Sequence, residues 1–140
     1  GFESLEAAKD AGTAFVFMGH GTAHVAKVTY SQMQAQMQNL GYENVFIGTV
    51  EGEPEETSAE AVIEAVKAAG YTNVVLRPLM VVAGDHANND MAGSDDDSWK
   101  TMFEAAGFTV DCQIHGLGEI ADVQALYVAH TKAAIDALNA

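Results

Sequence analysis

The stretch KDAGTAFVFMGHGT, residues 9–22, contains the unit from which the fold is built: a helix end, a glycine, an apolar strand and a polar turn. Glycine relieves left-handed strain just after a helix, so Gly12 is a suitable stop signal. The run from Thr13 to Met18 is apolar and rich in Val and Phe, which predicts a buried strand. His20 follows that strand within a tight Gly-His-Gly turn.

The same unit occurs three more times along the chain. Helical patterns end at Gly41, Gly70 and Gly107, and β-like runs follow at residues 44–50, 73–82 and 109–115. Alternating strands and helices predict a parallel sheet with right-handed crossovers and helices on both of its faces. We therefore expect a single α/β domain over residues 1–140, built on a four-stranded parallel sheet.

Capping residues and apolar periodicity predict where the helices lie. A short helix is expected over residues 4–11, and others follow caps at Thr29, Thr57 and Ser98. The last helix is expected over residues 122–138. Its apolar side includes His130, which is expected to be a packed histidine.

Composition excludes several classes of function. The net charge of −14 opposes nucleic-acid binding, which needs a basic patch to meet phosphates. The single cysteine, Cys112, excludes a disulfide within the chain and a Cys-based zinc site. No apolar run reaches the roughly 20 residues of a membrane helix. The first residues show no signal peptide, so a cytoplasmic location is expected, or a periplasmic one if a leader has been removed.

Residues with metal-binding or proton-accepting side chains follow the expected strands. Ligands bind beyond the carboxyl ends of the strands in open α/β sheets, so His20, Glu51 and His86 are expected on one rim. Two imidazoles and a carboxylate suit Co²⁺, Ni²⁺, Fe²⁺ or Zn²⁺ with coordination positions left open. Imidazole also accepts protons near neutral pH.

Other interpretations of the same residues remain open. A histidine after a strand is often a turn residue, and Glu51 alone is typical of a solvated loop. His24 is either another ligand or a loop residue, and His115 either contacts substrate or caps its strand. The Gly-His-Gly-Thr turn also suits a phosphate at a helix N-terminus, but it lacks the glycine and lysine spacing of the known phosphate motifs.

Several segments together resemble a known family, the anaerobic sirohydrochlorin cobaltochelatases of cobalamin biosynthesis, which are class II chelatases. The most specific segment is LRPLMVVAGDHANNDMAG, residues 76–93. Shorter segments support it by their order and spacing: residues 18–22, 50–52, 98–100 and 115–119. The similarity covers most of this chain and is to the C-terminal half of the family's two-domain proteins.

The resemblance implies a function and its residues. It implies insertion of a divalent metal, Co²⁺ with Fe²⁺ or Ni²⁺ as alternatives, into sirohydrochlorin or a related tetrapyrrole. His20, Glu51 and His86 match the metal-binding and catalytic residues of the family. The alternative hypothesis is a metal or haem carrier that uses the same ligands without turnover.

The resemblance also implies a partner. The family's tetrapyrrole lies in a cleft between two α/β halves, so this chain is expected to face a second half. That half is either an absent N-terminal domain, which we prefer, or the mate in a homodimer. Because the substrate is a polycarboxylate, the net charge of −14 requires local cations, for which Lys27, Arg77 and Lys100 are candidates.

Overall fold

The computed structural model describes residues 1–139 and confirms an α/β domain with a four-stranded, all-parallel sheet in the order β2-β1-β3-β4. The strands are β1 (Thr13–Gly19), β2 (Val45–Thr49), β3 (Asn73–Pro78) and β4 (Thr109–Cys112). The helices are α1 (Leu5–Asp10), α2 (Val28–Asn39), α3 (Ala59–Ala68), α4 (Trp99–Ala105) and α5 (Ala121–Leu138). Three 3₁₀ turns, η1 (Val25–Lys27), η2 (Glu55–Thr57) and η4 (Leu117–Glu119), and one π-helical turn, η3 (Ala87–Met91), complete the elements.

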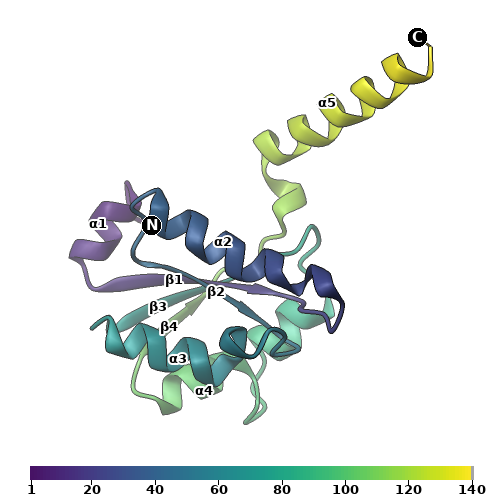
Figure 1. Cartoon of the computed structure of the whole chain (residues 1–140). Helices are drawn as coiled ribbons and strands as arrows, with labels where there is room; N and C mark the ends of the chain where they lie inside the picture. Colours follow the sequence, from purple (N-terminus) through teal and green to yellow (C-terminus); the bar gives the residue numbers. More distant parts are fainter. Residues whose placement is uncertain (140) are drawn as a thin grey trace.

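Helices lie on both faces of the sheet, as Figure 1 shows: α1 and α2 on one side, α3 and α4 on the other. The four glycines expected to stop helices all adopt positive φ, from 68° at Gly12 to 97° at Gly107. This conformation is easily accessible to glycine, so each helix ends where the sequence predicted and the next strand starts nearby.

The main core lies between the sheet and helices α3 and α4. Alternate residues of the central strands, such as Val16 and Leu76, point to this face and are fully buried. Trp99 and Phe103 of α4 pack against them, and their side chains anchor the helix to the sheet. Such burial of large apolar side chains supplies most of the stability of a domain of this size.

A side chain satisfies backbone hydrogen-bonding groups on the outer edge of β2. The Gln34 side-chain amide donates to the carbonyl of Val45 at 2.9 Å, and its Oε1 accepts from the N–H of Ile47 at 2.7 Å. Gln34 belongs to α2, so this pair of bonds also ties the helix to the strand. The arrangement occupies backbone groups that an edge strand otherwise leaves free.

Four sequence expectations about element bounds and caps need correction. Helix α2 begins at Val28, so Thr29 lies inside the helix, and its hydroxyl donates to the Ala26 carbonyl. The third strand ends at Pro78 rather than at residue 82, because proline has no N–H to continue the ladder. The fourth ends at Cys112 instead of residue 115. Helix α3 is capped by the Ser58 hydroxyl and not by Thr57, whose hydroxyl bonds to Thr49 and the Pro54 carbonyl instead.

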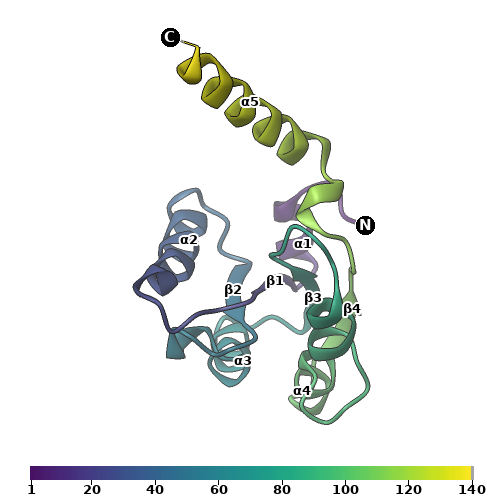
Figure 2. The ribbon, with the colours of Figure 1, turned by 90° about the vertical axis from the view of Figure 1, so that its right-hand side faces the viewer.

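The expected packing of the last helix is wrong. Helix α5 covers nearly the predicted residues, but it extends away from the body of the domain, as Figures 1 and 2 show from two directions. None of the described residues of α5 is buried, and His130 is exposed. Leu126 and Leu138 are 58% and 86% exposed. An apolar pattern predicts that a helix buries one side, but not against which surface.

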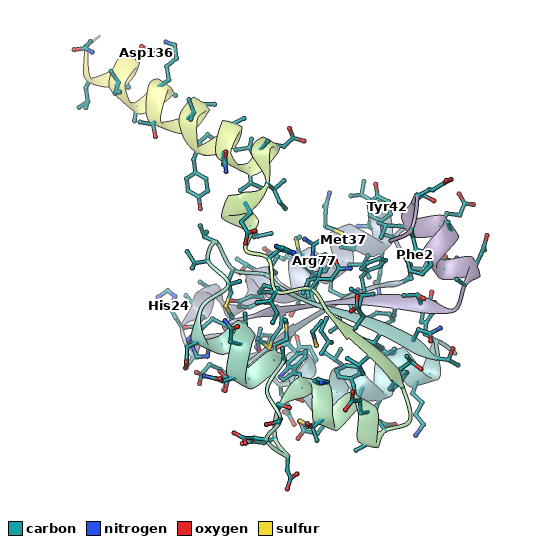
Figure 3. The ribbon with its side chains drawn as sticks, turned by 180° about the vertical axis from the view of Figure 1, so that it is seen from behind. Phe2, His24, Met37, Tyr42, Arg77 and Asp136 are labelled. Atoms are coloured by element: carbon teal, nitrogen blue, oxygen red, sulfur yellow. The ribbon has the colours of Figure 1, made fainter. Side chains whose placement is uncertain are left out.

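The sheet is incompletely covered on the face that carries α1 and α2. A cavity of about 770 Å³ is lined there by the second set of alternating strand residues, including Phe15, Arg77 and Asp111. A smaller apolar groove of about 300 Å³ lies between α2 and the start of α5, lined by Phe17, Met37 and others. Figure 3 shows Arg77, Met37 and Tyr42 on the side from which α5 extends.

No helix among residues 1–139 combines the length and apolar character that crossing a membrane requires.

Candidate functional site

The loops after β1 and β2 are held together by two backbone hydrogen bonds just beyond the paired strands. The N–H of Val50 donates to the carbonyl of Gly19, and the N–H of Glu51 donates to the carbonyl of His20, both at 2.9 Å. His20 and Glu51 are thus neighbours because strands β1 and β2 are neighbours. Their side chains approach to 4.0 Å between His20 Nε2 and Glu51 Oε1.

His86 reaches the same rim from the loop after β3. Its ring centroid lies 4.8 Å from that of His20, with the planes at 84° in an edge-to-face arrangement. The first N–H beyond β3, that of Leu79, donates to the Met18 carbonyl of β1 and keeps the two loops adjacent. The rim expected from the sequence is therefore observed, with His20 placed between Glu51 and His86.

The His20 turn is shaped by two features that leave little freedom. Gly21 has φ of 92°, and a Cβ at this position would lie 2.9 Å from the Cβ of Glu51. Its N–H donates to the hydroxyl of Tyr30 at 3.0 Å, which fixes the turn to helix α2. Any side chain larger than hydrogen at Gly21 would separate His20 from Glu51.

The adjoining loops are also cross-linked by polar side chains. Lys27 pairs with Glu53 at 2.7 Å, joining the segment after β1 to the segment after β2. The hydroxyls of Thr49 and Thr57 are buried and lie 2.7 Å apart. Lys27, one of the cations expected to meet the substrate, is thus already paired with a carboxylate. Arg77, another of them, lines the sheet-face cavity and not these loops.

The rim is open to solvent and is not a closed metal cage. The side chains of His20, Glu51 and His86 are 54%, 52% and 38% exposed. Within residues 1–139, no three His, Cys, Asp or Glu side chains form a ready-made metal-binding group. The rim side chains therefore need to rotate before they can share one ion.

Two further histidines are engaged elsewhere. The Nδ1 of His24 accepts the N–H of Ala26 at 3.2 Å and caps η1, so His24 serves the local backbone; Figure 3 shows it at the edge of the domain. His115 lies beyond β4 and bonds through Nδ1 to Glu119 at 2.9 Å. The His115 hydrogen bond lowers the pKa of Glu119, with a further contribution from the Gly116 N–H.

A shallow groove adjoins Glu51. Its volume is about 540 Å³, and it is lined by Trp99 and Met102 together with the carboxylates of Glu60, Asp96 and Asp97. The larger cavity of about 770 Å³ lies on the sheet face instead. We place the chemistry at the rim rather than at the sheet-face cavity, because the rim holds the histidines.

Sequence reasoning missed two residues of this region. Tyr30 follows the expected cap at Thr29, and nothing in the sequence indicated that its hydroxyl accepts the Gly21 N–H and holds the His20 turn. Asp90 was passed over, although it hydrogen-bonds to His86 at 2.6 Å. The spacing of four residues between His86 and Asp90 was the available signal, because residues four apart on a helical turn are neighbours.

Comparison with known proteins shows which family this chain is similar to. The sequence profile of the cobalt chelatase (CbiK) family matches residues 3–136. The sirohydrochlorin cobaltochelatase of Salmonella typhimurium (strain LT2) is 42% identical over 121 residues, which are 86% of this chain and 44% of that protein. The sirohydrochlorin cobaltochelatase CbiKC of Nitratidesulfovibrio vulgaris (strain Hildenborough) is 34% identical over 135 residues, covering 96% of this chain and 46% of that protein.

The chain thus spans less than half the length of these relatives. A crystal structure of a cobalamin (vitamin B12) biosynthesis protein, CbiX from Marinobacter aquaeolei VT8, has the same fold. It superposes with a TM-score of 0.66 at 17% identity, covering 89% of this chain and 98% of that one.

Proposed function

Because the chain belongs to the cobalt chelatase (CbiK) family, we propose that it contributes the metal-handling rim of a sirohydrochlorin cobaltochelatase. The observation that carries the proposal is the rim itself, where His20 lies 4.0 Å from Glu51 and 4.8 Å, ring to ring, from His86. In this proposal the three side chains bind Co²⁺, and a histidine accepts protons from the macrocycle.

The chemistry of insertion fits these groups. Co²⁺ must lose bound water as it enters, and the inner pyrrole N–H protons of the macrocycle must leave. Imidazole nitrogen and carboxylate oxygen are suitable ligands for such a borderline metal. An imidazole not bound to the ion is a suitable proton acceptor near neutral pH, and Glu51 is close enough to His20 to receive the proton in turn.

The openness of the rim also suits a transient ligand set. A substrate metal must be released, so a preformed cage that holds the ion tightly would oppose turnover. Half-exposed side chains that need rotation to converge provide weaker binding. Fe²⁺ and Ni²⁺ suit the same ligands, and competition among the metals in the assay would rank them.

The proposal includes a second α/β half as the partner. A flat tetrapyrrole needs two walls, because binding sites for such ligands bury most of the ligand surface. The half-covered sheet face and the projecting helix α5 support this partner, since both leave apolar groups exposed, including Leu126 and Tyr127 of the helix. The second half is either a domain on the same polypeptide or a second copy of this chain.

The test is an anaerobic assay of sirohydrochlorin with Co²⁺, followed by absorbance, with the solution mass measured in parallel. His20→Ala and His86→Ala are expected to lose metal insertion while the fold remains intact, because both residues are exposed. His130→Ala on the projecting helix α5 is the control for the rim and is expected to bind Co²⁺ as wild type does.

Each outcome of the assay separates the alternatives. Binding of Co²⁺ without product would favour a metal or haem carrier on a chelatase-like half. A strict monomer of this chain that inserts metal at the rate of the long relatives would contradict the two-wall argument. Equal loss of Co²⁺ binding in all three histidine variants would contradict the assignment of the rim.

A further inference from the structure

Asp90 forms a short hydrogen bond with one of the proposed ligands. Its Oδ2 lies 2.6 Å from Nδ1 of His86, and both side chains are partly exposed. The two residues are four apart: His86 caps the start of the π-helical turn η3, Ala87–Met91, and Asp90 lies within it. π-helical turns occur often at functional sites, because the wider turn changes where side chains point.

The turn that carries this pair is firmly anchored. Ala87 and Met91 are fully buried, and Met91 belongs to the main core. The side-chain amide of Asn88 donates to the Gly84 carbonyl at 2.7 Å, and that of Asn89 donates to Asp85 at 2.6 Å. The backbone at both ends of the His86–Asp90 pair is therefore fixed independently of the pair itself.

The bond determines which nitrogen of His86 is free. A carboxylate only accepts hydrogen bonds, so Nδ1 of the neutral ring must carry the proton and Nε2 carries the lone pair. His20 has the same form, because its Nδ1 lies 3.0 Å from the carbonyl of Gly21, which also only accepts.

His24 shows the opposite arrangement. Its Nδ1 accepts a backbone N–H, so its Nε2 must be protonated and cannot bind a metal. The hydrogen bonds of the structure thus separate His20 and His86, each with a free Nε2, from His24. The sequence alone had left the role of His24 open.

We infer that Asp90 is a positioning residue, which holds His86 in the Nδ1–H tautomer and aims its Nε2 at the metal. The inference rests on the proposed function, since it needs His86 to be a ligand. A carboxylate that accepts from a ligating histidine fixes the orientation of the ring and raises its basicity. Asp90 would bind no metal itself.

The chain offers a matched control at the end of β4. His115 and Glu119 form a pair of the same kind, four residues apart, with Nδ1 2.9 Å from the carboxylate. Among residues 1–139, no hydrogen bond or ion pair joins either residue to the rim histidines. Glu119→Ala therefore removes an equivalent bond without touching the proposed ligands.

The first measurement is the tautomer of His86 in the metal-free protein, by long-range ¹⁵N–¹H correlation spectra of ¹⁵N-histidine protein. Wild type is expected to show Nδ1 protonated and Nε2 with a lone pair. Asp90→Asn should keep this state, because the amide oxygen accepts the same bond, whereas Asp90→Ala should lose it. Glu119→Ala should change the His115 signals only.

The second measurement is a titration with Co²⁺ alone, followed by calorimetry and the visible spectrum, with circular dichroism to verify the fold. Asp90→Ala is expected to weaken binding by roughly 10- to 100-fold, the usual effect of losing such a partner. Asp90→Asn should weaken it by less than about tenfold. Glu119→Ala should bind as wild type does.

The outcomes distinguish failure of this inference from failure of the proposed function. An unaltered tautomer and Co²⁺ affinity in Asp90→Ala would overturn it. An equal loss of affinity in both Asp90 variants, with the tautomer kept in Asp90→Asn, would make Asp90 a direct ligand and overturn the positioning role. If wild type binds no Co²⁺, the metal role fails, and with it the inference, whatever the tautomer spectra show.

Discussion

One face of the sheet packs against α3 and α4 and contains the fully buried side chains of the core, whereas the opposite face is only partly covered by α1 and α2. On the packed face the alternate residues are apolar. On the other face they include Arg77, Asp111 and Gln113 beside the phenylalanines of β1. The difference indicates that stability comes mainly from the first face, and that the second is available for association.

The largest expected effect is a difference in the loss of stability between variants on the two faces. Phe103→Ala on the packed face should lower the free energy of unfolding by about 3–5 kcal/mol, because it leaves a cavity in a fully buried site. Phe17→Ala on the half-covered face should cost about 1–2 kcal/mol, because its ring is already partly exposed. Urea denaturation of both variants measures the difference, and equal costs would contradict the comparison.

The next effect concerns association through α5. The double variant Leu126→Ser and Tyr127→Ser should leave the stability of the domain within about 0.5 kcal/mol, because both side chains are exposed. Its affinity for the proposed second half, measured by sedimentation, should fall by roughly tenfold or more. Thr131→Ala on the same helix is the control. An unchanged affinity in the double variant would remove α5 from the interface.

A smaller effect uses thiol chemistry to compare the faces directly. Cys112 lies against the packed face, where burial raises the pKa of its thiol. It should react slowly with iodoacetamide, because the thiolate is the reactive form. Gln113→Cys in a Cys112→Ala background presents a thiol to the open face and should react several-fold faster at the same pH. Similar rates would show that the two faces are equally accessible.

The smallest effect is a pH dependence beside the open face. The pKa of Glu119 is lowered by the hydrogen bonds from His115 and the Gly116 N–H. The stabilisation by this carboxylate is therefore present above the ordinary glutamate pKa and is lost as the pH falls through the lowered value. The difference in urea midpoint between wild type and Glu119→Gln should shrink as the pH is lowered below about 4. A constant difference would exclude a charge effect.

Local signals in the sequence were sufficient for the sheet and for the position of the rim. Glycines at helix ends and apolar runs determine the strands, and parallel topology then places His20, Glu51 and His86 on one edge. The orientation of the two imidazole rings depends on how η3 packs through Met91, and no pattern in the sequence specifies that packing. The position of α5 also could not be predicted, because its apolar side indicates burial without identifying the surface that buries it.

The Gln34 side chain has a consequence for how copies of this protein can meet. An unprotected outer strand can add strands from other chains, which leads to aggregation. Here the amide of Gln34 already satisfies the Val45 carbonyl and the Ile47 N–H, so another chain can add to the β2 edge at these groups only by displacing the Gln34 side chain. A single neutral side chain thereby directs contacts between molecules away from strand addition at this edge and leaves the faces available for specific assembly.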